Sequence, residues 1–327
     1  MARIVTFGEA MIRLAPPRHQ RIEQAHSFDL EIGGAELNAA VGLARLGHDA
    51  YWVSALPDNP LGRLVRNRVR ETGVKDTFIS VVSEGRCGLC FLEPGAEPRP
   101  AQVLYDRSGS SISVAPPAAF DWPAIFRNAD WFHLTGITPA LSDSSATNAG
   151  HAIAAARKAG ARISIDLNYR SKLWTAERAG RVMAELISQI DLLIASPEDA
   201  RNLFDIAGDD IQNVARQLAK RFHIPVVATV RREEEGAWRG RVSGIAVSEN
   251  RSFESQWIAY DGVDRIGVGD AFAAGLIDGI LGNNLQTGVE TGTAMAALKH
   301  TIPGDLPLIS RNDVQMVLSG RTVGVRR

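Results

Sequence analysis

Residues 264–275 read Asp-Arg-Ile-Gly-Val-Gly-Asp-Ala-Phe-Ala-Ala-Gly, and this stretch says most about the chain. A strand is predicted before it at 257–260, and a helix of small residues is predicted after it at 269–281. Its first two glycines let backbone N–H groups converge on one point, and the helix start adds partial positive charge there. The sequence therefore predicts an anion hole. The groups that would form it are the amides of Gly267, Val268 and Gly269.

Asp270 follows this turn directly. A negatively charged carboxylate beside a site for anions would repel the ligand, so its presence there requires a chemical reason. The two glycines could form only a tight turn. A dinucleotide-binding loop would have glycine where Phe272 stands, and its aspartate would face a pyrophosphate. A P-loop would continue with Gly-Lys-Ser/Thr, which is absent here. We therefore predict that Asp270 is a general base, which takes a proton from a hydroxyl while the hole holds the phosphoryl group that is attacked.

Predicted strands and helices alternate along most of the chain. Strands are predicted at 3–7, 50–54, 131–134, 162–166, 192–195 and 226–230. Helices are predicted at 37–46, 61–71, 144–158, 176–189, 211–221, 269–281 and 288–300. This alternation is typical of an α/β fold with a doubly wound, mainly parallel sheet flanked by helices.

Two stretches, 10–32 and 78–107, interrupt that alternation with short strands and no clear helix. Strands predicted at 78–82, 88–92 and 101–105 would form a small β-meander. We expect these stretches to form a β-sheet lid that excludes water from a reaction centre, while 1–9, 33–77 and 108–327 form the α/β domain. A structural flap or a dimer arm is an alternative that is compatible with a lid.

The composition is that of an ordinary globular protein: 327 residues, 45 % hydrophobic, 22 % charged, with a formal net charge of −1. This balance argues against a nucleic-acid-binding protein, and the short basic tail at 321–327 is expected to be a frayed end. No apolar run is long enough for a membrane span or a signal peptide, so a cytoplasmic protein is expected. Cys87 and Cys90 have no second ligand pair for zinc and are interpreted as strand thiols.

A second glycine motif, 33–47, reads Gly-Gly-Ala-Glu-Leu-Asn-Ala-Ala-Val-Gly-Leu-Ala-Arg-Leu-Gly. Together with 267–270 it resembles the signatures of the ribokinase-like, PfkB-type carbohydrate kinases, in the expected order over nearly the whole chain. The resemblance implies a doubly wound α/β domain with a β-sheet lid, and a homo-oligomer, most simply a dimer formed through that lid.

Within this family the chain is most similar to the 2-keto-3-deoxygluconate kinases, through 33–38, 105–107, 166–174 and 299–305. That resemblance implies a site for a sugar acid, whose carboxylate a guanidinium binds in a planar pair. The substrate-binding residues implied are Gly34, Asn38, Tyr105, Arg107, Arg170 and Asp305. Two alternatives remain open: Arg170 could pair with the buried Asp166, and Arg107 could be a solvated loop charge.

The nucleotide would be ATP, lying across the carboxyl edge of the sheet. Mg²⁺ would bridge phosphate oxygens and keep most of its water ligands, so no protein metal site is expected. The nucleotide-binding residues that the resemblance implies are Asn168, Arg170, Ser196, Arg231, Gly236, Gly267 and Gly269, with 230–236 as a loop beside the phosphates.

The chain departs from the family pattern in several places. Val268 replaces an alanine, Ser196 and Asp199 stand at the ends of an Asn-x-x-Glu motif, and the lid lacks an aromatic at 89–90. The segment 231–235 reads Arg-Arg-Glu-Glu-Glu, and its carboxylates would repel phosphates unless they point away. Two alternatives follow: a kinase for fructose or another ketose, and a non-catalytic sugar-acid or nucleotide sensor. An NAD oxidoreductase is a more distant possibility.

Overall fold

The computed structural model describes residues 1–236, 238–249 and 251–321. Within them a ten-stranded sheet runs in the order β13-β12-β11-β10-β9-β8-β1-β4-β5, with β14 paired to β12. Its strands are β1 (Arg3–Phe7), β4 (Asp49–Pro57), β5 (Ile79–Val82), β8 (Trp131–Thr135), β9 (Arg162–Asp166), β10 (Leu192–Ile194), β11 (Val226–Glu234), β12 (Arg239–Ser248), β13 (Arg251–Glu254) and β14 (Ile258–Asp261). Pairing is parallel from β5 to β11 and antiparallel among β11, β12, β13 and β14.

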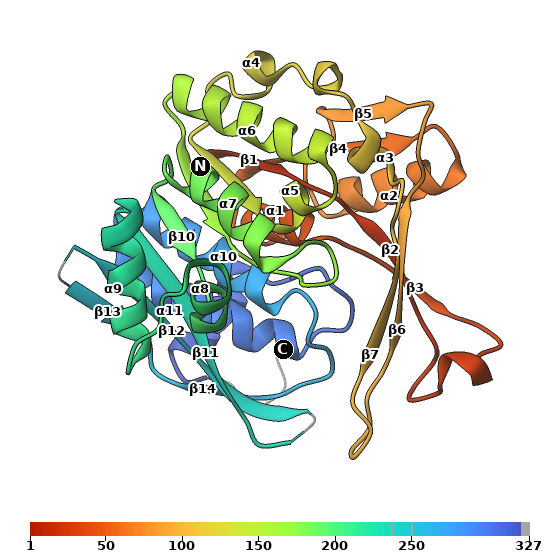
Figure 1. Cartoon of the computed structure of the whole chain (residues 1–327). Coiled ribbons are helices and arrows are strands. Elements are labelled where there is room, and N and C mark those ends of the chain that lie inside the picture. The colour runs from red at the N-terminus through yellow and green to blue at the C-terminus, as the bar shows by residue number, and fades with distance from the viewer. Residues whose placement is uncertain (237, 250, 322–327) are drawn as a thin grey trace.

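Helices cover both faces of this sheet, and Figure 1 shows α6, α7, α8 and α9 on the face toward the viewer. The longer helices are α1 (Ala35–Arg45), α2 (Pro60–Glu71), α6 (Asp143–Lys158), α7 (Ala176–Ile187), α8 (Pro197–Phe204), α9 (Ile211–Phe222), α10 (Val268–Leu281), α11 (Leu285–His300) and α12 (Arg311–Leu318). The short ones are η1 (Ile22–Gln24), α3 (Ser111–Val114), η2 (Pro117–Ala119), α4 (Trp122–Ile125) and α5 (Ile137–Ala140).

Two hydrophobic cores lie on opposite faces of the sheet. Ile4 belongs to the core that α1, α10 and α11 share, and Val5 belongs to the core beneath α6, α7 and α9. Successive strand residues point to opposite faces, so an apolar run such as that of β1 fills both cores. The predicted α/β fold with a mainly parallel sheet and a small second sheet is confirmed.

The small sheet, called the lid below, has the order β3-β2-β6-β7. Its strands are β2 (Met11–Ala15), β3 (Asp29–Gly33), β6 (Gly88–Glu93) and β7 (Gln102–Asp106). It projects from the body at the right of Figure 1. Because β2 pairs with β6 in parallel, the lid is a mixed sheet, and the predicted meander is wrong. The strand predicted at 78–82 belongs to the large sheet, where β5 extends the edge beside β4.

The predicted end of the strand at 226–230 is also wrong. Strand β11 continues to Glu234 and pairs with β12 over its full length, from Val226–Ser248 to Glu234–Gly240. The segment expected to be a phosphate loop is therefore the outer half of a long β-ribbon. Among the described residues no helix is both long and apolar enough to cross a membrane. Of the basic tail predicted at 321–327, residues 322–327 lie outside the described residues.

Candidate active site

Helix α10 begins at a glycine turn. Its N-cap, Gly267, has a φ of 82°, in the left-handed region that favours glycine. A Cβ there would lie 2.2 Å from the carbonyl oxygen of Asp305. The amides of 268–270 belong to the first turn and have no partner within the helix. A Cβ on Gly269 would meet no atom within 4 Å. A helix N-terminus with unused N–H groups therefore borders open space, as an anion hole requires.

Asp270 lies in that first turn with 8 % of its surface exposed. Its Oδ2 accepts a hydrogen bond of 2.7 Å from Asn38 Nδ2, and Oδ1 has no hydrogen-bond partner in the described parts of the chain. Burial raises the pKa of Asp270 to about 6, and the bond from Asn38 and the attraction of Arg170 oppose the rise. Such a carboxylate is ionised at pH 7 and still basic enough to accept a proton.

Asn38 connects the two glycine motifs, which are 232 residues apart at this contact. Its Oδ1 accepts a 3.3 Å hydrogen bond from the Gly34 amide, while its Nδ2 binds Asp270. The predicted role of Asn38 was to bind sugar hydroxyls. Only one N–H of its amide group remains available for that, so its clearest role here is to orient the Asp270 carboxylate.

Gly33 and Gly34, which precede α1, lie so close to neighbouring atoms that no side chain fits at either position. A Cβ on Gly33 would lie 2.0 Å from Asp305 Oδ2, and one on Gly34 would lie 1.9 Å from the carbonyl oxygen of Glu9. The predicted substrate residues Gly34 and Asp305 are thus brought to one side of the site. Since backbone cannot move aside cheaply, any side chain at Gly34 would displace the turn.

Asp305 belongs to a buried group of charges beneath the lid. Arg13 of β2 lies 2.8 Å from Asp305 Oδ1 and 2.9 Å from Asp264 Oδ2. Asp264 also accepts the amides of Ile266 and Gly304, each at 3.0 Å. Burial raises the pKa of Asp305, and the Arg13 guanidinium opposes that rise. This group holds the chain on both sides of the glycine turn.

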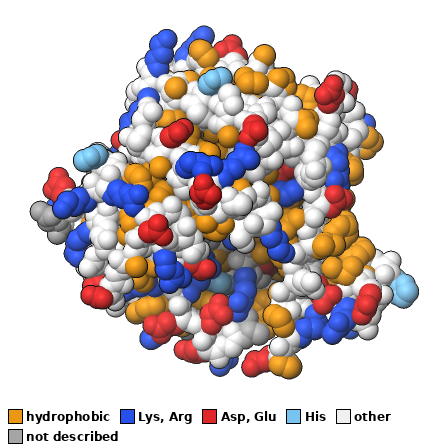
Figure 2. All heavy atoms as spheres, in the orientation of Figure 1, with side chains coloured by type: hydrophobic (Ala, Val, Ile, Leu, Met, Phe, Trp, Pro, Cys, Tyr) orange, Lys and Arg blue, Asp and Glu red, His pale blue; other side chains and the backbone are white. Residues whose placement is uncertain are grey.

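The inner face of the lid carries the predicted sugar-acid ligands. Cys90 pairs with Arg13 on one neighbouring strand and with Tyr105 on the other, so all three share that face. Arg107 follows two residues after Tyr105, and its guanidinium carbon lies 5.6 Å from the tyrosine ring centre. Figure 2 shows the molecule hollowed between this sheet and the body. Both cysteines are free thiols.

Arg107 is not a solvated charge. Its side chain is 13 % exposed, and its Nε donates a 2.8 Å hydrogen bond to Glu9 Oε2, which Nη2 also contacts. The other oxygen of Glu9 is buried without a hydrogen-bond partner among the described residues. Glu9 therefore forms an ion pair with Arg107, the arginine that is expected to bind the substrate carboxylate.

Arg170 faces three carboxylates without forming an ion pair within 4 Å in the described residues. It is exposed and lies four residues after the end of β9. Burial raises the pKa values of Asp166, Asp199 and Asp270, and the positive charge of Arg170 opposes each rise. The alternative of an Arg170–Asp166 ion pair is therefore not realised. Asn168, at a φ of 39°, donates its amide to Asp166 Oδ1 over 3.2 Å.

Replacing Asp166 with asparagine should stabilise the protein at alkaline pH. Burial, with repulsion from Asp199 and Asp270, raises the pKa of Asp166 to about 8. Since the folded-state pKa lies above the unfolded one, Asp166 favours folding at low pH, and that contribution is lost as pH rises toward 8. The variant should melt several degrees higher than the parent at pH 8 and equally at pH 4, in thermal unfolding followed by circular dichroism. An equal difference at both pH values would contradict the assignment.

Ser196 is the N-cap of α8. Its hydroxyl accepts the Asp199 amide at 3.0 Å and donates to Asp199 Oδ2 at 2.8 Å. The departure from Asn-x-x-Glu noted in the sequence is thus a capping box. The side chains of Ser196 and Asp199 are hydrogen-bonded to each other. Burial raises the pKa of Asp199.

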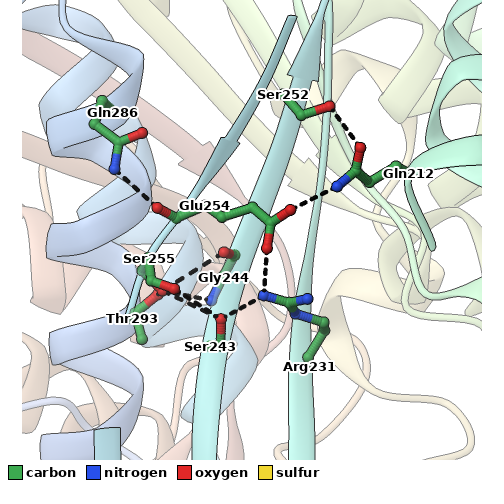
Figure 3. A network of polar contacts seen from close by, with 9 residues as sticks. All are labelled: Gln212, Arg231, Ser243, Gly244, Ser252, Glu254, Ser255, Gln286 and Thr293. Atoms are coloured by element: carbon green, nitrogen blue, oxygen red, sulfur yellow. Dashed lines mark hydrogen bonds and ion pairs between the residues drawn. The ribbon is translucent and has the colours of Figure 1, made fainter. Parts of the chain in front are cut away.

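Arg231, predicted to bind nucleotide, is anchored within the β-ribbon. Figure 3 shows it pointing from β11 toward Ser243 and Glu254, to which Nη2 donates over 2.8 Å and 2.9 Å. The backbone of Glu254 in turn accepts Gln286 of α11 at 2.9 Å. This network fixes the ribbon to α11, so Arg231 is held by its own chain.

The acidic segment is largely neutralised. Glu233 accepts Arg241 Nε at 2.7 Å, and Glu234 accepts Arg265 Nη1 at 3.0 Å. Two of the three carboxylates are therefore paired, and the ribbon presents less negative charge than its sequence suggests. Gly236, predicted as nucleotide-binding, lies near the lid, since a Cβ on it would be 3.9 Å from Glu97 Oε2.

The family model described as "pfkB family carbohydrate kinase" matches residues 1–308. The chain belongs to this family. It is therefore a carbohydrate kinase, as the two glycine motifs indicated.

This kinase is similar to two curated relatives over nearly its full length. It is 39 % identical to the 2-dehydro-3-deoxygalactonokinase of Haloferax volcanii, covering 100 % of this chain and 99 % of the relative. It is 30 % identical to the 2-dehydro-3-deoxygluconokinase of Bacillus subtilis, covering 98 % and 96 %. The solved 2-dehydro-3-deoxygluconokinase of Thermotoga maritima superposes with a TM-score of 0.94 at 39 % identity, covering 98 % of each chain.

Several residues that shape the site of this kinase were not predicted. Glu36 lies inside the quoted glycine motif, yet its role appears only in three dimensions. It is buried and accepts Thr135 Oγ1 at 2.8 Å and Thr138 Oγ1 at 2.7 Å, which ties α1 to the end of β8. Burial raises its pKa to about 7. Glu9 and Arg13 were also not predicted. The signal that could have found Glu9 is its place two residues after the buried strand β1, and Arg13 lies within the lid strand β2.

Proposed function

We propose that this kinase transfers a phosphoryl group from ATP to the C6 hydroxyl of 2-keto-3-deoxygluconate, releasing 2-keto-3-deoxy-6-phosphogluconate and ADP. The observation that carries the proposal is Asp270. Its carboxylate is buried, and one of its oxygens has no hydrogen-bond partner in the part of the chain that the structure describes. It lies at the start of a helix whose first amides border open space, and Asn38 connects it to the second glycine motif.

The proposed chemistry is an in-line displacement. Asp270 takes the hydroxyl proton as the sugar oxygen forms a bond to the γ-phosphorus, and the bond to the bridging oxygen of ADP breaks. The amides of Gly267, Val268 and Gly269 stabilise charge on the transferring group. Closure of the lid excludes water, which would otherwise accept the phosphoryl group.

The residues present fit ATP with Mg²⁺. The open space beside Gly269 leaves room for phosphate. Arg170, which has no ion pair within the described residues, would lie between the substrate and the nucleotide. Mg²⁺, when bound, would neutralise phosphate charge, and Asp166 and Asp199 are the carboxylates that would help to hold it. Asn168, Ser196, Arg231 and Gly236 would line the nucleotide side. Because ATP is the proposed donor, we place the enzyme in the cytoplasm.

The acid end of the sugar would be bound by Tyr105 and Arg107 of the lid, with Asp305 accepting a hydroxyl near the reacting end. Arg107 is already oriented by Glu9, so it would bind the substrate carboxylate through its remaining N–H groups. Such a prepared guanidinium loses little side-chain entropy on binding.

Replacing Arg107 with alanine should raise KM for the sugar acid by roughly 10- to 100-fold, since a charge-assisted contact contributes about 1.5–3 kcal/mol. The rate with a neutral ketose should change little. Arg86→Ala is the matched control, because the side chain of Arg86 forms an exposed ion pair with Asp106 of the same strand as Tyr105. Equal effects on acid and neutral sugars would favour the alternative of a ketose kinase.

The deciding experiment is a coupled ADP-release assay, with and without Mg²⁺. Its panel contains 2-keto-3-deoxygluconate, its C4 epimer 2-keto-3-deoxygalactonate, fructose and no sugar, because the two relatives at 39 % identity are named for the two epimers. We expect Mg²⁺-dependent ADP with a sugar acid. Faster turnover of fructose would refute the substrate, and binding of sugar acid without ADP would identify a sensor.

A homodimer formed through the lid is part of the proposal. The face opposite Arg13 carries Leu30 and Leu104, which are 36 % and 58 % exposed. Large apolar side chains gathered on one sheet face are typical of an interface. Light scattering of the purified protein should give twice the 35.3 kDa mass of the chain, and a monomer would remove this part of the proposal.

A further inference from the structure

A lysine is completely buried next to the glycine turn of the candidate site. Lys299 lies in the last turn of α11 with 0 % of its surface exposed. Its Nζ donates a 2.9 Å hydrogen bond to the carbonyl oxygen of Ile302, the one hydrogen bond that the ammonium makes within the described residues. Removing an ammonium from water costs free energy unless nearby groups stabilise its charge. The burial of Lys299 therefore suggests that its charge has a role.

The side chain of Lys299 runs directly beneath Gly267. A Cβ on this glycine would lie 3.3 Å from Lys299 Cε, so the lysine stem fills the space under the left-handed turn. The amides of that turn form the proposed anion hole on the other side. The methylene that carries the ammonium therefore packs against the turn from which α10 starts.

The charges that face Lys299 come from four elements. Asp264 precedes the turn, Asp305 follows α11, Asp270 begins α10, and Arg13 comes from the lid strand β2. This group contains three carboxylates and, with Lys299 included, two cations. Without Lys299 the underside of the anion hole would carry two uncompensated negative charges, which would repel a transferring phosphoryl group.

Ion pairing alone does not explain this lysine. Asp264 and Asp305 already have Arg13, at 2.9 Å and 2.8 Å, and Asp264 accepts two backbone amides as well. An apolar side chain of the same length could fill the volume. What only lysine supplies at this position is a positive charge close to the turn.

We propose that Lys299 is a positioning residue of the phosphoryl-transfer site: its buried ammonium supports the Gly267 turn and supplies the positive charge that keeps the amide hole attractive to phosphoryl oxygens and Asp270 ionised. The inference rests on the proposed kinase function. Lys299 itself touches neither substrate, and it acts through the turn and through the base.

The test is Lys299→Met, which keeps the length and removes the charge, with Lys158→Met on the exposed end of α6 as the matched control. We expect kcat for the sugar acid to fall roughly 10- to 100-fold, less than the loss of a direct donor, with KM nearly unchanged. The midpoint of the acidic limb of kcat, expected near the Asp270 pKa of about 6, should move to higher pH. Asp305 and Arg170, which also face Asp270, are unchanged in both variants. Lys158→Met should match the parent.

Should Lys299→Met not fold, as judged by circular dichroism, the same readouts are taken on Lys299→Gln, which keeps a donor for Ile302 without the charge. Lys299→Ala supplies a third readout, since added propylammonium should restore part of its turnover. A folded Lys299→Met or Lys299→Gln with a parental kcat and an unmoved acidic limb would overturn the inference. That result would leave the kinase proposal standing, whereas absence of ADP release by the parent protein would refute the kinase proposal itself.

Discussion

Asp270→Asn should lower turnover of the sugar acid roughly 10³-fold in the ADP-release assay, within the range that general-base catalysis contributes. The asparagine keeps the shape of the side chain and can still accept the hydrogen bond from Asn38, which in the parent measures 2.7 Å. What it loses is the ability to take a proton. Because burial raises the pKa of Asp270, the neutral amide should fold at least as well as the carboxylate at pH 8.

The control for this variant lies eight residues further along the same helix. Asp278 binds His48 at 2.9 Å and Arg311 at 2.6 Å, and these partners hold its pKa below the usual value although burial opposes them. Asp278→Asn should therefore lower the melting temperature and leave kcat unchanged. The two variants are expected to show opposite patterns, one stable and inactive, the other less stable and active. If Asp270→Asn turned over sugar at the parental rate, Asp270 would not be the base.

Gly267→Ala should be the second most damaging substitution, with kcat reduced roughly 10²- to 10³-fold, as for loss of an oxyanion-hole donor. Its φ of 82° strains any other residue, at a cost of about 1–3 kcal/mol. In addition, the new Cβ would lie 2.2 Å from the backbone oxygen of Asp305. The turn must therefore move, and the amides that it aims would move with it.

Two other glycines separate the effect on activity from the effect on folding. Gly269 and Gly150 both lie within helices, and a Cβ on either meets no atom within 4 Å. Gly150→Ala should raise the melting temperature slightly and leave kcat unchanged, because alanine favours a helix. Gly269→Ala should be as stable as Gly150→Ala but should have a lower kcat, because its methyl group enters the space proposed for phosphate. If Gly267→Ala kept parental kcat, the anion hole would have to lie elsewhere.

How much the sequence could predict depends on the distance between the interacting residues. The Gly-Val-Gly-Asp turn and its helix were predicted from neighbouring residues, and α10 begins at Val268, one residue from the predicted start. The strand predicted at 162–166 matches β9 in full. Such features follow from local backbone preferences and from the period of apolar residues.

Errors occurred where pairing with a distant segment decides the outcome. The residues of β5 have the pattern of a short strand in either sheet, and only their contact with β4 places them in the large one. In the same way β11 extends to Glu234 because β12 pairs with it and because Arg241 and Arg265 neutralise its acidic residues. A run of like charges therefore forms a strand because distant partners pair with it. Local propensity does not include such partners.

The amino-acid sequence by itself determined the class of fold, the glycine turn with its aspartate, and the second glycine motif, because each depends on residues within a few positions of one another. Only the tertiary structure decided that Asn38 orients Asp270, that Glu9 holds Arg107, and that Arg13 and Lys299 lie beneath the turn. Charges and hydrogen bonds act over a few ångströms of space, and the chain brings such partners together only when it folds.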